Sequence, residues 1–111
     1  MSTERTSPPS PSPATVRVVM PRQLRDLARA EGEVVLEVAP ATLGAALDAL
    51  EAAHPALLGT IRDRESGRRR AMIRIYAAGE DCSDAGPDAP LPASVVEGRE
   101  PLRLVGSIAG G

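Results

Sequence analysis

The segment from Thr42 to His54 limits the folds open to this chain more than any other stretch of the sequence. Thr42 is a residue type that often caps a helix N-terminus. Four apolar residues follow at i, i+3, i+4 and i+7, namely Leu43, Ala46, Leu47 and Leu50. This stripe predicts an amphipathic helix, and the helix is expected to end at His54-Pro55. We interpret His54 as a helix-capping residue rather than a metal ligand or a base, because no second His is available to join it.

The residues before this helix have the two-residue period of half-buried strands. Residues 15–20 place Val16, Val18 and Met20 on one face, and residues 33–38 alternate in the same way. The intervening residues 22–32 suggest one helical turn or a structured loop. We therefore expect an irregular antiparallel hairpin, after which the helix returns the chain parallel to its start.

Further strands are predicted after the helix. Residues 71–77 are apolar on both faces, which is typical of a central or well-covered strand, and residues 102–105 form the last strand. Leu57, Leu58 and Ile61 are expected to close the far side of the core. The order of elements predicts an α+β fold with a mixed sheet and one helix across one of its faces.

Composition divides the chain into three parts. Residues 1–14 are rich in Pro and Ser and almost free of apolar side chains, which predicts a disordered leader. Residues 15–106 are expected to form one domain, and residues 107–111 a flexible tail.

The residue types exclude several kinds of function. Tyr76 is the only aromatic residue, and the net charge is −2, so neither base stacking nor a strong basic excess supports nucleic-acid binding. All 13 basic residues are arginine, which excludes a Walker A loop and a lysine Schiff base. The single cysteine, Cys82, permits no internal disulfide and no cysteine metal cluster. We expect a cytoplasmic protein without a membrane span or a metal.

Two charged stretches lie between the predicted strands. The triplet Arg68, Arg69 and Arg70 is read as a solvated loop, with a docking patch for an acidic partner as the alternative. Residues 78–90 are read as an acidic surface excursion that does not match a calcium-binding loop. Carboxylates near Cys82 disfavour its thiolate, so we do not expect it to act as a nucleophile.

The chain ends in a tail of small residues, Ser107, Ile108, Ala109, Gly110 and Gly111. A diglycine end carries a carboxylate without nearby side chains, so it can thread a narrow channel in a partner. Five extended residues reach on the order of 17 Å. The alternative is an ordinary frayed terminus, which the dipeptide by itself favours.

The chain resembles the MoaD/ThiS sulfur-carrier family, in particular its longer members of the type used in protein-dependent cysteine synthesis. The resemblance covers roughly residues 15–111 and rests on five stretches: Thr42–Glu51, Ile75–Asp81, Pro90-Leu91, Glu97-Gly98 and Ile108–Gly111. It implies a ubiquitin-like β-grasp fold with a mixed four- to five-stranded sheet.

The resemblance also implies a function. An E1-like adenylating enzyme would use ATP to activate the Gly111 carboxylate, with residues Ser107–Gly110 inserted in its channel. A sulfur donor of the rhodanese or cysteine desulfurase type would then convert the adenylate to a thiocarboxylate. A biosynthetic enzyme would accept the sulfur, for cysteine, molybdopterin, thiamine or a secondary metabolite. The carrier itself would bind no cofactor and supply no catalytic side chain.

Two other functions share the same tail. A ubiquitin-like modifier would form amide bonds to other proteins through Gly111 after the same activation step. A β-grasp binding module would carry the diglycine incidentally. The sequence leaves these alternatives open.

Overall fold

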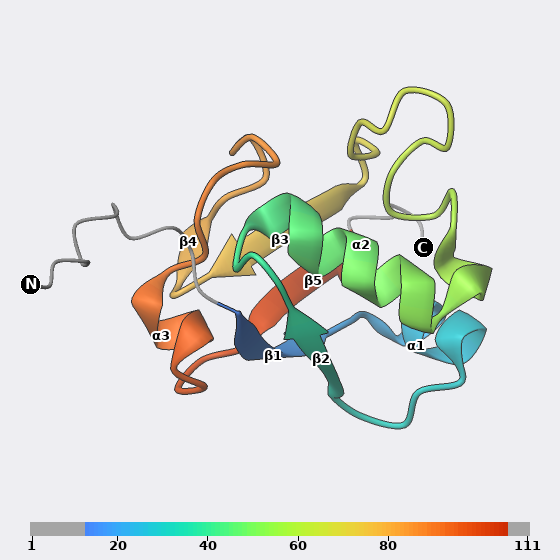
Figure 1. Ribbon diagram of the computed structural model, residues 1–111. Coiled ribbons are helices and arrows are strands. Elements are labelled where there is room, and N and C mark those ends of the chain that lie inside the picture. The colour runs from blue at the N-terminus through green and yellow to red at the C-terminus, as the bar shows by residue number, and fades with distance from the viewer. Residues whose placement is uncertain (1–12, 107–111) are drawn as a thin grey trace, which may run out of the picture.

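The computed structural model describes residues 13–106, which form a mixed five-stranded sheet with helices against one face (Figure 1). The elements are β1 (Ala14–Val19), α1 (Arg22–Ala28), β2 (Val34–Val38), α2 (Leu43–Ala53), the 3₁₀ helix η2 (Pro55–Leu57), β3 (Ile73–Ala77), β4 (Glu80–Asp81), α3 (Ala93–Val96) and β5 (Leu102–Gly106). The strand order is β2-β1-β5-β3-β4. The predicted α+β class, with one main helix across a mixed sheet, is confirmed.

The hairpin of β1 and β2 forms as the alternation predicts. Its antiparallel register runs from Ala14 opposite Val38 to Val18 opposite Val34. Ala14 is buried and paired, so the first strand begins one residue before the predicted domain boundary at 15. The connection between the strands contains α1, which closes with Arg29 in the left-handed conformation, at φ 57°.

The last strand lies in the centre of the sheet. β5 pairs with β1 in parallel, with Val18 opposite Leu102, and with β3 in antiparallel fashion, with Ile73 opposite Gly106. β3 therefore runs opposite to β1, so the expectation that the helix returns the chain parallel to its start is wrong. The parallel neighbour of β1 is β5, because the chain reverses once more after β3.

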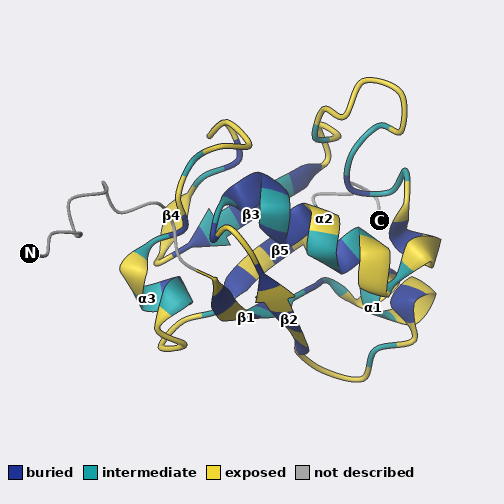
Figure 2. Cartoon of the chain, in the orientation of Figure 1, coloured by how far each residue is buried: buried dark blue, intermediate teal, exposed yellow. Residues whose placement is uncertain are grey.

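Helix α2 crosses the sheet and buries its predicted stripe (Figures 1 and 2). The Thr42 hydroxyl accepts a hydrogen bond from the Ala45 amide at 3.2 Å, which confirms the predicted N-cap. The amides of Leu43 and Gly44 donate to the carbonyls of Ala89 and Pro87, at 2.9 and 2.8 Å. The acidic excursion thus caps the first turn of the helix with its own backbone.

Gly44 allows this close crossing of helix and loop. A Cβ at this position would lie 2.8 Å from the Pro87 Cβ and 2.9 Å from the Pro87 carbonyl oxygen. No methyl group fits in that space, so the helix and the loop approach each other through a glycine.

Three large apolar side chains lie at the surface, and one of them, Leu58, was expected in the core. Leu58 is 43% exposed, because η2 ends at Leu57 and the extended backbone that follows turns Leu58 outward. In α1, Leu24 and Ala28 are buried while Leu27 is 48% exposed. Met72, predicted within the third strand, precedes β3 and is 51% exposed.

We predict that Leu47→Ala destabilises the fold by about 2–5 kcal/mol, because Leu47 is 5% exposed and its truncation leaves a cavity under α2. Denaturant unfolding measures the change. Leu58→Ala is the matched control and should cost well under half as much, since half of that side chain already contacts water. Equal losses in the two variants would contradict the assigned inner face of α2.

Candidate functional site

The tail begins at Gly106, at the end of the central strand. β5 pairs with β3 along its whole length and with β1 at Leu102 and Arg103, so Gly106 is held at the end of the strand by its pairing with Ile73. Five residues beyond this point can place a carboxylate on the order of 17 Å away. The predicted site residues Ser107, Ile108, Ala109, Gly110 and Gly111 themselves lie outside the described residues.

The face of the sheet opposite α2 is open, and β5 runs through its centre. Strand register aligns Val19, Arg103 and Tyr76 in one row across β1, β5 and β3. Val105 follows one step nearer the tail and is 37% exposed. We name the set Val19, Tyr76, Arg103 and Val105 the open-face patch. The patch combines apolar surface with one cation, Arg103. This residue precedes Gly106 by three positions, or about 10 Å along the strand.

Asp81 organises the edge of the sheet next to this patch. Its Oδ2 accepts from the Arg74 Nη2 at 2.6 Å, and its Oδ1 accepts from the Ser83 amide at 2.8 Å. The buried Ser83 hydroxyl in turn accepts from the Ile75 amide at 2.7 Å. Hydrogen bonds from Ser83 and then from Arg74 lower the pKa of Asp81 to about 2. These hydrogen bonds therefore favour the charged form of the Asp81 carboxylate.

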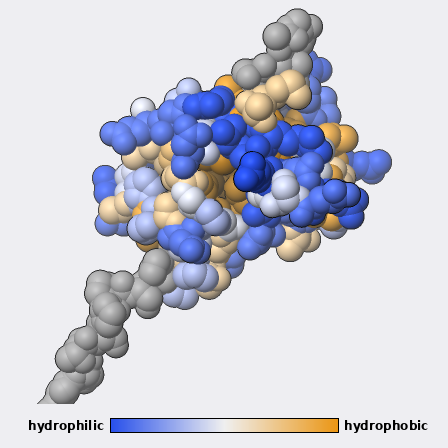
Figure 3. Space-filling view, turned by 90° about the horizontal axis from the view of Figure 1, so that it is seen from above, coloured by the Kyte–Doolittle hydropathy of each residue, from blue (hydrophilic) through white to orange (hydrophobic). Residues whose placement is uncertain are grey.

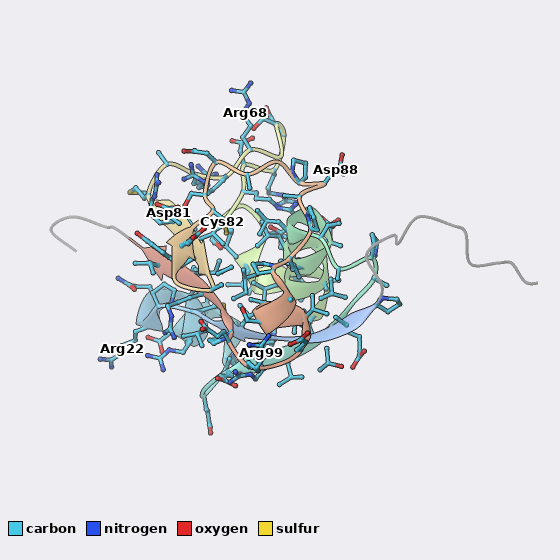
Figure 4. The ribbon with its side chains drawn as sticks, turned by 90° about the vertical axis from the view of Figure 1, so that its left-hand side faces the viewer. Arg22, Arg68, Asp81, Cys82, Asp88 and Arg99 are labelled. Atoms are coloured by element: carbon cyan, nitrogen blue, oxygen red, sulfur yellow. The ribbon has the colours of Figure 1, made fainter. Side chains whose placement is uncertain are left out.

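Cys82 lies next to Asp81, in surroundings that do not activate its thiol (Figure 4). Burial raises the pKa of its thiol, and the neighbouring Asp81 charge raises it further. Its environment therefore favours the neutral thiol, in line with the sequence-based expectation.

The structure separates the three consecutive arginines. Arg69 is largely buried, and its guanidinium donates to the carbonyls of Ser83 at 3.0 Å and Ile73 at 2.6 Å. Arg70 donates to the Gly59 carbonyl. Arg68 is exposed and points away from the domain (Figure 4). The triplet is thus no continuous patch, because Arg69 fastens the loop to β3, and a docking role stays a prediction for Arg68.

Sequence reasoning missed the role of Arg62. Its Nη2 lies 2.7 Å from both the Asp48 Oδ1 and the Glu51 Oε1, and its side chain is 18% exposed. The hydrogen bond with Glu51 is the main cause that raises the pKa of Arg62. The i, i+3 acidic pair on the outer side of α2 was the available signal. This ion pair anchors the loop after η2 to the helix.

Within residues 13–106, no group of three His, Cys, Asp or Glu side chains is placed to hold a metal ion. In the same range, no helix is long and apolar enough to cross a membrane. Two long loops, residues 58–72 and 82–92, connect η2 to β3 and β4 to α3. Seen from above, the surface on their side of the molecule is mostly hydrophilic (Figure 3).

Comparison with solved structures places this arrangement among known proteins. Neither a protein-family model nor a curated protein sequence matches the chain. SAMP1 from Haloferax volcanii is 27% identical, with a TM-score of 0.69 over 88% of this chain and 100% of that chain. A chain of the Amycolatopsis orientalis BexX/CysO complex is 25% identical, with a TM-score of 0.66 over 86% and 99%. The chain has the ubiquitin-like β-grasp fold of these MoaD/ThiS-type proteins.

A third solved structure shares the fold at a lower sequence identity. Small archaeal modifier protein 1 from Methanosarcina acetivorans is 19% identical, with a TM-score of 0.68 over 89% of this chain and 98% of that chain. The resemblance drawn from the sequence motifs is thereby confirmed. SAMP1 is, by its name, a small archaeal modifier protein.

We predict that Asp81→Asn lowers the stability of the fold at neutral pH. We also expect the stability of this variant to decrease less steeply as the pH is lowered. A folded-state pKa of about 2, below the ordinary 3.8, adds stability that is present above about pH 4 and disappears as the pH falls toward 2. Urea midpoints at neutral, mildly acidic and strongly acidic pH measure this. The control is Asp88→Asn, an exposed aspartate, which should leave the profile unchanged. An Asp81→Asn profile parallel to that of the unaltered protein would refute the charged corner.

Proposed function

We propose that this β-grasp protein is a cytoplasmic sulfur carrier that works through its C-terminal carboxylate. The carrying observation is the diglycine end, Gly110-Gly111, placed five residues beyond a strand that is fixed at the centre of the sheet. The strand sets where the tail starts, and the small residues leave the carboxylate accessible. The likeness to a chain of the BexX/CysO complex supports both the carrier role and a protein partner.

The chemistry follows from the exposed carboxylate. A Gly111 oxygen attacks the α-phosphorus of ATP in the partner's site, and pyrophosphate leaves. A persulfide sulfur of a donor protein attacks the acyl carbon, and AMP leaves with the bonding electrons. A second thiol then cleaves the sulfur-sulfur bond, is itself oxidised to a disulfide, and leaves a thiocarboxylate on Gly111. The thiocarboxylate delivers sulfide to an electrophile held by an acceptor enzyme.

A ubiquitin-like modifier is the second candidate, and the likeness to SAMP1 favours it. The same acyl adenylate would then pass to an amine of another protein, with AMP as the leaving group. The chain contains no lysine, so it cannot accept itself through a lysine side chain. Any amide product must therefore involve a different protein or an N-terminus.

Intact mass analysis separates the two functions. Incubated with its adenylating enzyme, ATP and a persulfide donor, the protein should gain the mass of one oxygen-to-sulfur exchange at Gly111. Removal of Gly110-Gly111 should abolish the gain, and Gly111→Ala should reduce it strongly because a methyl group crowds the carbonyl. Sulfur transfer by the truncated protein would disprove the carrier proposal. An amide linkage to a lysine of another protein would establish the modifier function in its place.

The open-face patch is the surface we assign to the adenylating partner, because Arg103 and Val105 of β5 lie just before Gly106, where the tail begins. Arg103→Glu should lower kcat/KM for activation about tenfold, equivalent to about 1.4 kcal/mol. Arg68→Glu makes the same charge change on a distant loop and should alter activation less than twofold, roughly within experimental scatter. The opposite ranking would assign docking to the loop that carries the arginine triplet. Both residues are exposed, so unfolding midpoints should stay unchanged.

A further inference from the structure

A cavity of about 580 Å³ lies between the two long loops, beside the first turns of α2. Its floor is apolar and belongs to the core, with Leu43 and Leu47 from α2 and Ile75 from β3. The loops form its walls and contribute cationic and hydroxyl side chains, namely Arg62, Arg68, Arg69, Ser66 and Ser83. A space of this size with an apolar floor and a few polar groups has the features of a small-molecule site.

The charge of Arg69, in the wall of this cavity, is poorly compensated. Its side chain is 18% exposed. Nε and Nη1 donate to the carbonyls of Ser83, Arg70 and Ile73, which accept hydrogen bonds but carry no net charge. Among the described residues its only ion-pair partner is Asp84, whose Oδ1 lies 3.3 Å from Nη2 and whose side chain is 88% exposed. A largely buried cation with one loosely held counter-ion favours a further anion beside it.

One donor of this guanidinium is still unused. An arginine side chain has five N–H groups. The single N–H of Nε and the two of Nη1 are directed at the three carbonyls, and Nη2 directs one of its two at Asp84. The other N–H of Nη2 has no partner among the described residues. Because Arg69 and Asp84 both line the cavity, an anion that enters it meets this donor.

The other charged groups of the lining determine its sign. Arg62 already lies 2.7 Å from the carboxylates of both Asp48 and Glu51, neither of which lines the cavity. Arg68 is exposed and adds a cation at the rim, while Asp84 is the only acidic residue of the lining. The whole chain has a net charge of −2, so a general attraction for anions is absent and any binding must come from these local groups.

We propose that this cavity binds a small amphiphilic anion, which is a molecule with an apolar chain or ring and one anionic head group. The apolar part lies on the floor, and the head group replaces Asp84 at Nη2 of Arg69. The displaced Asp84 side chain loses little, because it is already mostly in water. The floor residues are almost completely buried, so a narrow apolar group fits there better than a folded partner. The site does not depend on the proposed function, and Gly106 is not part of its lining.

Methyl NMR with octanoate as the probe tests this proposal. Ile75 lies at the floor of the cavity, whereas Ile73 lines an apolar hollow of about 200 Å³ beside α1, together with Leu27 and Arg70. Ile61 lines neither space. Octanoate should therefore shift the δ1-methyl signal of Ile75 in a saturable manner and much further than the signals of Ile73 and Ile61. Octanol has the same chain without the charge and should bind on the order of tenfold more weakly.

Asp84→Asn is the decisive variant, because it removes the carboxylate that competes with the ligand for Arg69. The Kd for octanoate should fall about threefold, in the range of an exposed ion pair. Asp88→Asn is the matched control, since it removes an exposed charge from the same loop at a residue that does not line the cavity. Its Kd should stay close to that of the unaltered protein. Arg69→Gln should raise the Kd about tenfold.

Three results would overturn the proposal. Equal binding of octanol and octanoate would show that the cation has no part in recognition. Equal effects of Asp84→Asn and Asp88→Asn would assign the attraction to the overall charge of the loop. Shifts of Ile73 as large as those of Ile75, or no saturation below the concentration at which octanoate forms micelles, would show that the cavity is not the binding site. Asp84 and Asp88 are both exposed, so the comparison does not depend on a variant that disturbs the fold.

Discussion

The central place of β5 is the constraint on which the rest of the structure depends. The last strand inserts between β1 and β3, with its inward residues Leu102 and Leu104 almost completely buried. The sheet is therefore incomplete until the end of the chain is in place. The same pairing fixes Gly106 between α1 and the start of β3. The chain therefore leaves the described domain from a central strand of the sheet.

Arginine serves in this protein as a connector of loops. Arg69 reaches three backbone carbonyls and a carboxylate, and Arg62 bridges two carboxylates of α2. A planar guanidinium presents several donors in fixed directions, which a lysine ammonium does not. The two long loops contain little regular structure, so these side-chain contacts hold them in place. Two arginines of the triplet, Arg69 and Arg70, therefore make contacts that hold the fold.

The neighbourhood of the tail divides into two surfaces with different properties. The open-face patch is mixed in character and centred on Arg103, whereas the hollow beside α1 is apolar and has Arg70 at its rim. The alternation of β5 decides which side each residue faces.

The sequence by itself determined the elements whose signals are local. The N-cap at Thr42, the buried face of α2 through Leu47 and the alternation of β1 and β2 all depend on residues within a few positions of each other. The order of strands, the parallel partner of β1, the capping of α2 by the loop around Pro87 and the burial of Arg69 were decided only by the tertiary structure. Each of these joins segments far apart in the chain, and no local period encodes such a pairing. The outward turn of Leu58 has the same origin, since the hydrophobicity of a residue does not state which side of a short helix it will face.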